Sequence, residues 1–258
     1  ARFLARVAPP LDGRSHKGEG GRIAVLGGSA DFTGAPYYAG MAALRTGAEL
    51  VYVLAAREAA LPLKAYSPEL MVTPVYSGDG SASAVSGAVE RMIPRLHALV
   101  VGPGLGRKPQ VLRGAARAVE RAAAAGVPVV VDADGMQAVI EHPNCVQAGG
   151  VLLTPNAAEY RRLLEAAGMG TVMAREGEKL ERQLMALCSE LSGGSRKHEL
   201  TICLKGATDL VATPSTVVAC TEPGTPRRSG GFGDVLAGTS GAILAWLRMS
   251  GGGGGAGG

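Results

Sequence analysis

Short apolar runs alternate with longer segments of helical composition, and this alternation constrains the fold more than any other feature of the sequence. The run 127–131 is the clearest example: it is continuous and β-branched, as is typical of a strand buried in a parallel sheet. Because strand-like and helix-like segments alternate along most of the chain, we predict an α/β fold with a mostly parallel central sheet and helices on both faces. We expect an irregular lead-in (1–15), a single catalytic domain (16–248) and a disordered, glycine-rich tail (249–258).

Glycine and polar residues directly follow the predicted strands. Right-handed crossovers bring the carboxyl ends of parallel strands to one edge of a sheet, where open α/β sheets bind ligands. We therefore expect the following segments to meet at that edge: Gly27-Gly28, Gly102–Gly106, Asp132–Asp134, Thr154–Asn156 and Lys205-Gly206.

A glycine-rich loop with Gly230, Gly231 and Gly233 precedes the apolar run 235–246, which we predict to be a helix. The unpaired N–H groups and the positive dipole end of a helix N-terminus bind anions. Arg227 and Arg228 lie just upstream, and with the helix dipole they are expected to favour the charged form of Asp234. Asp234 is unusual beside an anion site: it is either a helix cap or a base held next to a phosphate.

Other polar residues allow two interpretations each. The segment Gly102–Gly106 is either a tight turn or a bare backbone surface under a ligand, and Lys205 is either solvated or in contact with a phosphate. Asp132 and Asp134 could bind Mg²⁺ through water or cap helices. Asn156, with Glu159 three residues on, reads as a helix cap.

The composition argues against several functional classes. The net charge is only +4, and no basic stripe with interleaved aromatic residues occurs, which disfavours a nucleic-acid partner. No apolar run approaches the roughly 20 residues that a membrane span needs. The four cysteines show no CxxC spacing, and Cys203 and Cys220 lie in strand-like runs, where free cysteine behaves as a small core residue. No secretory signal is visible, so we expect a reducing compartment, cytoplasmic or mitochondrial. Whether the protein forms a homo-oligomer stays open.

Taken together, the motifs resemble those of the ATP-dependent NAD(P)H-hydrate dehydratase family, which belongs to the ribokinase-like superfamily. The resemblance covers nearly the whole chain and is nearer to the eukaryotic branch, given the segment Tyr66–Leu70 and the pair Arg227-Arg228. It implies a three-layer α/β/α sandwich. The motifs that carry it, in order, are His16–Gly18, Gly27–Ser29, Asp31–Tyr37, Ala65–Leu70, Val101–Gly106, Asp132–Gly135, Leu153–Asn156 and Lys205-Gly206.

The resemblance implies ATP-dependent dehydration of the S epimers of hydrated NADH and NADPH, with ADP and phosphate as the other products. It also implies a catalytic base, Asp234, and Mg²⁺ that accompanies ATP through ligands that we do not name. The residues implied to bind the hydrated cofactor are Ala35, Gly104, Asn156, Ala157, Ala158, Glu159, Tyr160, Arg161, Arg162 and Asp234. Those implied to bind ATP are Lys205, Gly206, Ala207, Thr208, Asp209, Gly224, Thr225, Pro226, Arg227, Arg228, Ser229, Gly230, Gly231, Phe232 and Gly233.

The chain departs from the family at position 232. Eukaryotic members usually read Gly-Gly-Gln-Gly-Asp there and bacterial members Gly-Gly-Ser-Gly-Asp, whereas this chain has Phe232. Two alternatives stay open: a ribokinase-like vitamin kinase, which would stop at the phosphorylated alcohol, and a nucleotide-binding scaffold protein without activity.

Overall fold

The central sheet of the computed structural model has nine strands in the order β3-β2-β1-β4-β5-β6-β7-β8-β9. The structure describes residues 4–10, 16, 18–77, 80–175, 177–193, 200–225 and 229–252. Within these residues, the elements in chain order are α1 (Leu4–Val7), β1 (Arg22–Leu26), α2 (Gly34–Thr46), β2 (Leu50–Ala56), α3 (Arg57–Tyr66), β3 (Met71–Tyr76), α4 (Ala82–Met92), the 3-10 helix η1 (Ile93–Arg95), β4 (Ala98–Val101), α5 (Pro109–Ala124), β5 (Val129–Val131), α6 (Asp134–Glu141), the 3-10 helix η2 (Pro143–Val146), β6 (Val151–Leu153), α7 (Ala157–Ala166), α8 (Glu178–Leu191), β7 (Thr201–Leu204), β8 (Asp209–Ala212), β9 (Val217–Cys220) and α9 (Phe232–Gly252).

Strand β1 lies at the point where the strand order reverses. It pairs in parallel with β2 on one side and with β4 on the other. The chain moves outward from β1 to β3, returns to β4, and then proceeds to β7 in the opposite direction. Such a switch point leaves a crevice at the carboxyl ends of the two strands that flank it, which is where open α/β sheets bind ligands.

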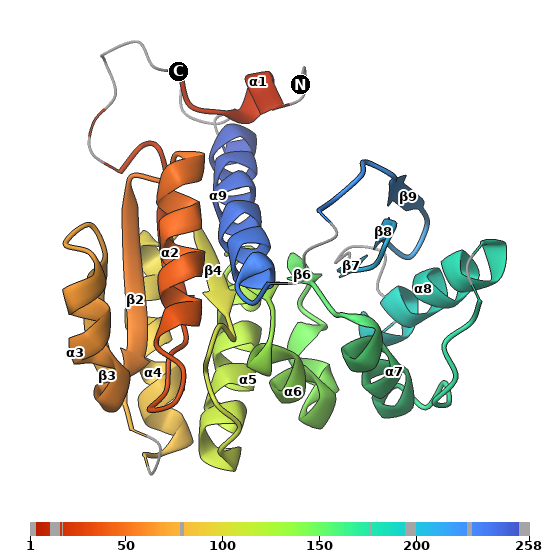
Figure 1. The fold of residues 1–258 in the computed structure, drawn as a ribbon, viewed down its shortest axis with the longest axis horizontal. Helices are drawn as coiled ribbons and strands as arrows, with labels where there is room; N and C mark the ends of the chain where they lie inside the picture. Colours follow the sequence, from red (N-terminus) through yellow and green to blue (C-terminus); the bar gives the residue numbers. More distant parts are fainter. Residues whose placement is uncertain are drawn as a thin grey trace.

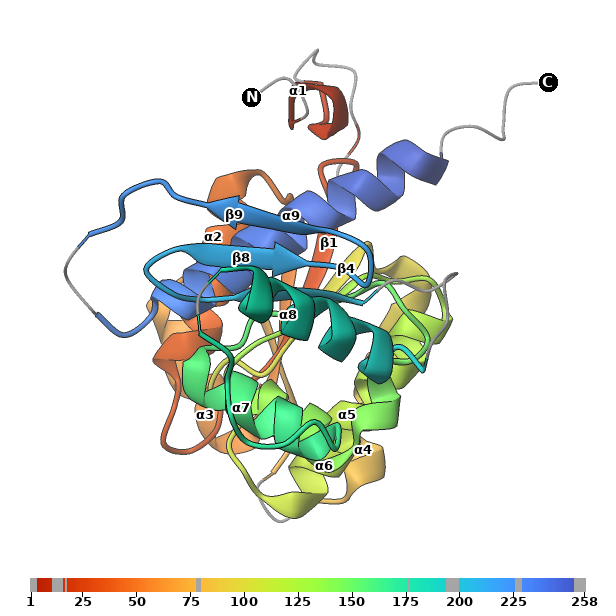
Figure 2. The ribbon, with the colours of Figure 1, turned by 90° about the vertical axis from the view of Figure 1, so that its right-hand side faces the viewer.

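Helices cover both faces of the sheet. Helices α2 and α9 lie side by side on one face, and α4, α5 and α6 pack in succession on the other (Figure 1). The antiparallel strands β8 and β9 form one edge, beside α8 (Figure 2). The predicted mostly parallel sheet with helices on both faces is therefore confirmed.

Most predicted elements are present with shifted ends. Strand β5 begins at Val129 rather than Val127, because the Val127 N–H instead donates to the carbonyl of Ala122 and because Pro128 has no N–H to donate. Helix α9 begins at Phe232 and continues to Gly252, which lies inside the range predicted as a disordered tail. Helix α1 lies within the predicted lead-in. The division of the chain into these three parts stays a prediction.

Two sequence-based expectations were wrong at the level of elements. Helix α6 was not predicted: Asp132 and Asp134 were read as possible Mg²⁺ ligands or helix caps at the end of a strand, but no helix was assigned after them. Cys220 was expected in the core together with Cys203, but it is exposed on β9, the outermost strand, whereas Cys203 is buried in β7. All four cysteines are free.

Candidate active site

The loops that follow β1 and β4 meet at the switch point of the sheet. The Gly28 N–H donates to the carbonyl of Pro103 at 2.9 Å. Gly102 has a φ of +121°, and a β-carbon there would stand 1.8 Å from the Asp132 carbonyl oxygen. Only glycine fits where the backbone after β4 passes that of Asp132. The glycine at position 102 therefore lets the ends of β4 and β5 approach each other.

This approach also brings two predicted substrate residues together. A β-carbon on Gly104 would lie 3.3 Å from that of Ala35, which is in the first turn of α2. Gly104 itself is buried. The expected proximity of the β1–α2 segment to the glycine turn after β4 is present.

The carboxyl ends of β5, β6 and β7 meet at Asp132. Its Oδ1 atom accepts hydrogen bonds from Thr154 Oγ1 and from Lys205 Nζ, each at 2.7 Å. The side chains of Asp132 and Thr154 are buried, and that of Lys205 is one-quarter exposed. The Lys205 N–H donates to the Pro155 carbonyl at 2.9 Å, which fixes the backbone from which the lysine projects.

The N-terminus of α9 lies against this ion pair. A β-carbon on Gly233 would stand 3.2 Å from Asp132 Oδ2 and 3.3 Å from Lys205 Nζ. The Val235 N–H donates to the Gly231 carbonyl, which is the first hydrogen bond of the helix. The N–H groups of the residues just before Val235 therefore have no acceptor within the helix. These donors and the helix dipole form an anion site beside an ammonium group.

Asp234 is the third residue of α9, within its first turn rather than at its cap position. Burial is the main cause that raises its pKa to about 7, and the Asp132 carboxylate adds to the shift while Lys205 opposes it. Burial thus favours the neutral form of Asp234, against the direction expected from the sequence. The part of that expectation that concerns Arg227 and Arg228, which lie outside the described residues, stays a prediction. A carboxyl group with a pKa near neutrality is suited to general acid–base chemistry.

Asn156 and Glu159 form a capping box at the start of α7. Asn156 Oδ1 accepts from the N–H groups of Ala158 and Glu159, and Glu159 Oε2 accepts from the Asn156 N–H at 2.9 Å. The cap expected from the sequence is confirmed. The pKa of Glu159 is raised, chiefly by burial.

Tyr160 and Arg162 differ in what they offer a ligand. The Tyr160 side chain is fully buried, and its hydroxyl donates to Gln183, so it packs inward under α8. The Nε atom of Arg162 is buried with no hydrogen-bond partner among the described residues. An orphaned guanidinium nitrogen is costly, and an acceptor on a ligand would satisfy it.

A cavity of about 330 Å³ opens beside Lys205, on the side toward α8. The predicted ATP residues Gly206, Ala207 and Thr208 line it together with apolar side chains from four elements or loops: Met173, Leu180, Leu204 and Leu210. Glu181 adds a carboxylate to the wall. An apolar cavity of this size with a few polar groups has the character of a small-molecule site.

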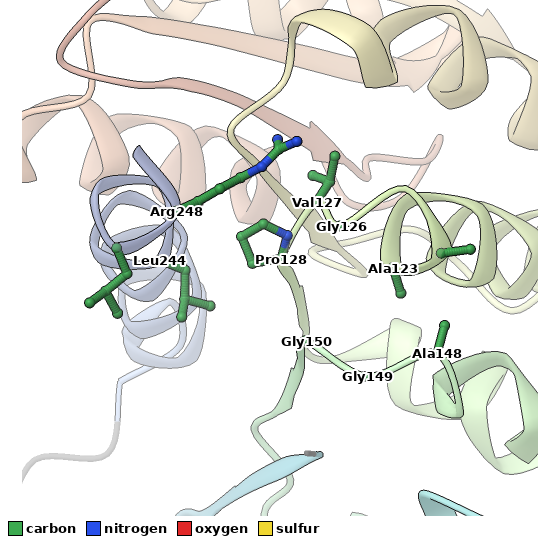
Figure 3. A pocket seen from close by; sticks show the side chains of 11 residues that line it. Ala123, Gly126, Val127, Pro128, Ala148, Gly149, Gly150, Leu244 and Arg248 are labelled. Atoms are coloured by element: carbon green, nitrogen blue, oxygen red, sulfur yellow. The ribbon is translucent and has the colours of Figure 1, made fainter. Parts of the chain in front are cut away.

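A larger cavity, of about 730 Å³, lies at the other end of the sheet (Figure 3). It is lined by Pro128 and Gly150, which precede β5 and β6, and by Leu244 and Arg248 of α9. No residue predicted to bind ATP or substrate lines it. It is therefore separate from the candidate site despite its greater volume.

Asp134 does not face the ion pair. Its carboxylate accepts from the Gly106 N–H at 3.0 Å and pairs with Arg107 at 2.8 Å, which ties the turn after β4 to α6. Asp132 is engaged by Lys205 and Thr154. Among the described residues, no group of three or more His, Cys, Asp and Glu side chains could hold a metal ion. The two aspartates thus do not fit as a ready protein cage for Mg²⁺.

The remaining predicted ATP residues fall into three groups. Asp209 begins β8, and its Oδ1 accepts from the Gly206 N–H at 2.8 Å, which shapes the turn after β7. Gly224, Thr225, Ser229, Gly230 and Phe232 are exposed around the glycine loop. Pro226, Arg227 and Arg228 lie outside the described residues.

Tyr38 is a site residue that the sequence did not single out. Gly231 has a φ of +96°, and a β-carbon there would stand 3.1 Å from Tyr38 Cδ2, so the ring lies against the glycine loop. Tyr37 links it to Tyr66 through ring contacts, and the Tyr66 hydroxyl bonds with Thr33 at 2.7 Å. No local pattern marks such a contact, because Tyr38 and Gly231 are far apart in the chain.

Comparisons with known proteins agree with this arrangement. The profile of the NAD(P)H-hydrate dehydratase family matches residues 23–252. The chain is 39% identical over 249 residues to the ATP-dependent (S)-NAD(P)H-hydrate dehydratase of Danio rerio, with 96% of this chain and 72% of that protein covered. It is 42% identical over 254 residues to the enzyme of that name from Batrachochytrium dendrobatidis, with 93% and 76% covered.

Solved structures share the ribokinase-like fold. A ribokinase-like superfamily protein from Enterococcus faecalis superposes with a TM-score of 0.67 at 21% identity and covers 94% of this chain and 78% of its own. An ADP/ATP-dependent NAD(P)H-hydrate dehydratase from Bacillus subtilis, co-crystallised with ATP and Mg²⁺, has a TM-score of 0.65 at 22% identity, with 97% and 86% covered. A hydroxyethylthiazole kinase from Pyrococcus horikoshii reaches 0.59 at 20%, with 96% and 78% covered.

Proposed function

The chain belongs to the NAD(P)H-hydrate dehydratase family, and we propose that it restores NADH and NADPH from the S epimers of their hydrates at the expense of ATP. The γ-phosphoryl group of ATP passes to the hydroxyl oxygen on the hydrated nicotinamide ring, and ADP leaves. The ring C–O bond then breaks, inorganic phosphate departs with that oxygen, a ring proton is lost, and the reduced cofactor is restored.

One observation carries this proposal: the start of α9, the Lys205 ammonium and the Asp234 carboxyl group converge at the switch-point edge of the sheet. Phosphoryl transfer depends on positioning and charge stabilisation more than on covalent participation by the protein. Backbone N–H groups at the helix start hold the transferred group, and Lys205 donates hydrogen bonds to its oxygens. Asp234 accepts the proton of the attacking hydroxyl.

We place ATP in the cavity beside Lys205 and along the glycine loop. Its phosphates then reach the N-terminus of α9, while its base enters the apolar space lined by Leu180 and Leu210. The turn Gly206–Asp209 shapes the mouth of the cavity, and Asp209 holds it through the Gly206 N–H. The predicted ATP residues in the described part of the glycine loop, Ser229–Gly233, would close the other side.

We place the hydrated cofactor across the switch point. Ala35 and Gly104 supply close-packed backbone there, and the N-terminal turn of α7 supplies Asn156 to Arg162. The orphaned Arg162 Nε is a donor for a phosphate or hydroxyl oxygen of the cofactor. Because Tyr160 is buried, its contribution is limited to its backbone and to packing.

Magnesium would accompany ATP as part of the nucleotide complex. Mg²⁺ keeps several waters and binds nucleotide phosphates with few protein ligands, so it does not need a protein cage. The ion would supply charge neutralisation at the phosphates. No step at Asp234 depends on a metal ligand from Asp132 or Asp134, both of which are already paired.

A coupled assay tests the proposal. The protein is mixed with the hydrated form of NADPH, with and without ATP, and the restored NADPH absorbance and released phosphate are followed. Equal amounts of NADPH, ADP and phosphate are expected. Because a thiazole kinase shares the fold, hydroxyethylthiazole is run in parallel. A stable phosphorylated alcohol without phosphate release would favour the vitamin-kinase alternative, and no turnover with either would favour a nucleotide-binding scaffold.

A further inference from the structure

We propose that Asp132 is a positioning residue of this site: its carboxylate holds the Lys205 ammonium against the N-terminus of α9, where the transferred phosphoryl group is bound. The inference rests on the proposed function, and it assigns a role to a buried residue that touches neither ATP nor the hydrated cofactor in that proposal. Four observations carry it.

The first observation is the burial and pairing of the carboxylate. Asp132 is only 2% exposed, and its Oδ1 atom accepts from both Lys205 and Thr154 at 2.7 Å. A buried carboxylate without partners would be strongly unfavourable. The two donors come from the ends of two neighbouring strands, so the pair joins β5, β6 and β7 at the rim of the sheet.

The second observation is the fixed backbone of Asp132. Its N–H donates to the Val101 carbonyl at 3.0 Å, and its own carbonyl accepts from Gly135 at 2.9 Å. The next residue, Ala133, has a φ of 49° and a ψ of −123°, and it is the one non-glycine residue with positive φ in the described part of the chain. Backbone strain of this kind persists where the surrounding structure over-determines it, and such positions cluster at functional sites.

The third observation is the contact with the glycine loop. The Oδ2 atom of Asp132 and the Nζ atom of Lys205 both face Gly233, at 3.2 and 3.3 Å from the place of a β-carbon. The absence of a side chain at Gly233 is what allows the ion pair to lie directly against the helix start. Lysine carries three N–H donors, and the described residues use one of them, which leaves two for phosphate oxygens.

The fourth observation is the balance of charge around the phosphoryl site. Asp132, Glu159 and Asp234 lie around the Lys205 ammonium, and the charges of Asp132 and Lys205 act on both other carboxyl groups. The Arg162 guanidinium acts on Glu159 as well but is not among the causes that shift Asp234. Without Lys205, Asp132 would repel a phosphate. With it, the pair is close to neutral and the flexible lysine side chain is already ordered before ATP arrives, which lowers the entropy cost of binding.

A double-mutant cycle tests the inference. The variants are Asp132→Asn, Lys205→Met and the combination of both, and the readout is the ATP dissociation constant from calorimetry, measured without the hydrated cofactor. Asp132→Asn keeps an oxygen acceptor for Thr154 but frees the lysine, and we expect it to weaken ATP binding about tenfold, a factor typical of losing one charged hydrogen bond.

The sign of the coupling decides between interpretations. In Lys205→Met the Asp132 charge is left alone beside the phosphates, so the double variant should bind ATP at least as tightly as Lys205→Met does. If the double variant binds ATP more weakly than Lys205→Met, Asp132 acts independently of Lys205 and the inference is overturned. The inference would also be overturned if Asp132→Asn, unlike the other variants, needed more Mg²⁺ than the wild type to bind ATP. That result would identify Asp132 as a metal ligand.

Asp134→Asn is the matched control, because it removes a second partly buried, charge-paired aspartate two residues away. Its partners are Gly106 and Arg107 rather than Lys205, so the ATP dissociation constant should change less than about twofold, within the scatter of remote substitutions. An equal loss in both variants would mean general damage to the strand end and would overturn the inference. If Asp132→Asn does not fold, the comparison of Lys205→Met with the neutral double variant decides on its own.

Because ATP binding is measured alone, the two proposals fail separately. Normal ATP binding without turnover of the hydrated cofactor refutes the proposed function and leaves the cycle interpretable. Normal turnover together with no coupling between Asp132 and Lys205 in ATP binding refutes the role of Asp132 and leaves the proposed function intact.

Discussion

At the scale of single residues, the site depends on Asp234. Asp234→Asn keeps the shape of the side chain but removes the proton acceptor, so we expect turnover to fall by about 10²- to 10⁴-fold. ATP binding should persist, because the backbone donors stay and a negative charge beside the phosphates is removed. Turnover and ATP affinity of this one variant are measured together. Near-normal turnover would show that Asp234 is only a structural residue.

The raised pKa of Asp234 gives the pH dependence a definite direction. Since the base must be ionised and its pKa is about 7, kcat/KM should rise roughly tenfold per pH unit below 7 and level off above it. Stability should change in the opposite direction. The folded protein binds this proton more tightly than the unfolded chain, so this contribution to stability is lost as pH rises from about 4 to 7.

Asp234→Asn removes that titration and serves as the control. The variant should lose the acid limb of the rate profile that the wild type shows near pH 7, and its melting temperature at pH 8 should equal or exceed that of the wild type. A wild-type limb centred near pH 4 would mean that the carboxyl group is not shielded from solvent during the reaction.

Phe232 tests whether the glycine loop acts through its backbone. The ring is 53% exposed, and it occupies the first position of α9, where the N–H group points out of the helix whatever the side chain. Phe232→Gln should therefore change kcat/KM less than roughly tenfold, or about 1.4 kcal/mol of barrier. Phe232→Ala distinguishes a contribution of the ring from a contribution of glutamine. If kcat/KM rises well above tenfold in Phe232→Gln but not in Phe232→Ala, the glutamine side chain itself contributes to catalysis.

At the scale of elements, the junction of β5 and α6 stores strain that serves the site. Ala133 has the φ and ψ of a position that glycine favours in tight turns, and it separates two aspartates with different partners. Ala133→Gly should stabilise the fold by about 1 kcal/mol, because relief of the strain exceeds the added entropy of the unfolded chain. Denaturant unfolding measures this change.

The same variant shows whether the strain has a function. If the strained turn orients Asp132, Ala133→Gly should raise the ATP KM while it raises stability. A destabilised variant would mean that Ala133 is relaxed in solution. Gly126→Ala is a suitable comparison, since Gly126 also has a positive φ but lies in open space at the far end of the sheet and should be destabilised instead.

At the scale of the whole molecule, one ligand should stabilise the entire domain, because the candidate site joins strands from both halves of the sheet. A ligand at 100 times its dissociation constant stabilises a protein by about 2.7 kcal/mol. For a domain of this size, that corresponds to a rise in melting temperature of roughly 5–10 °C. We expect this rise with ATP and magnesium, and a smaller one in Lys205→Met at the same ATP concentration. Equal rises in both proteins would place ATP away from Lys205.

None of the helices in the described ranges is long and apolar enough to cross a membrane, in agreement with the hydropathy of the sequence. The compartment and the oligomeric state stay predictions.

The sequence by itself determined the fold class and the family. Alternating strand-like and helix-like periodicity is a local property, and so are a glycine loop before an apolar helix and a cap at Asn156, which is why each was readable without coordinates. Motifs at the strand ends identified the family by their resemblance to those of known members. Right-handed crossovers place such ends along one edge whatever the strand order, which is why these motifs were expected to form one site. Helix α6 was not predicted, because its first residues belong to a motif at the end of a strand that has the composition of a turn.

Only the tertiary structure decided how these parts act on one another. The order of the strands, the pairing of Asp132 with Lys205 across 73 positions and the contact of Tyr38 with Gly231 are long-range, and no local pattern encodes them. The same holds for the charge of Asp234. From the sequence, a helix dipole and two arginines are expected to favour the ionised form, whereas burial and the Asp132 carboxylate raise its pKa to about 7 among the described residues. Desolvation depends on everything packed around a group, and packing is known only once the chain is folded.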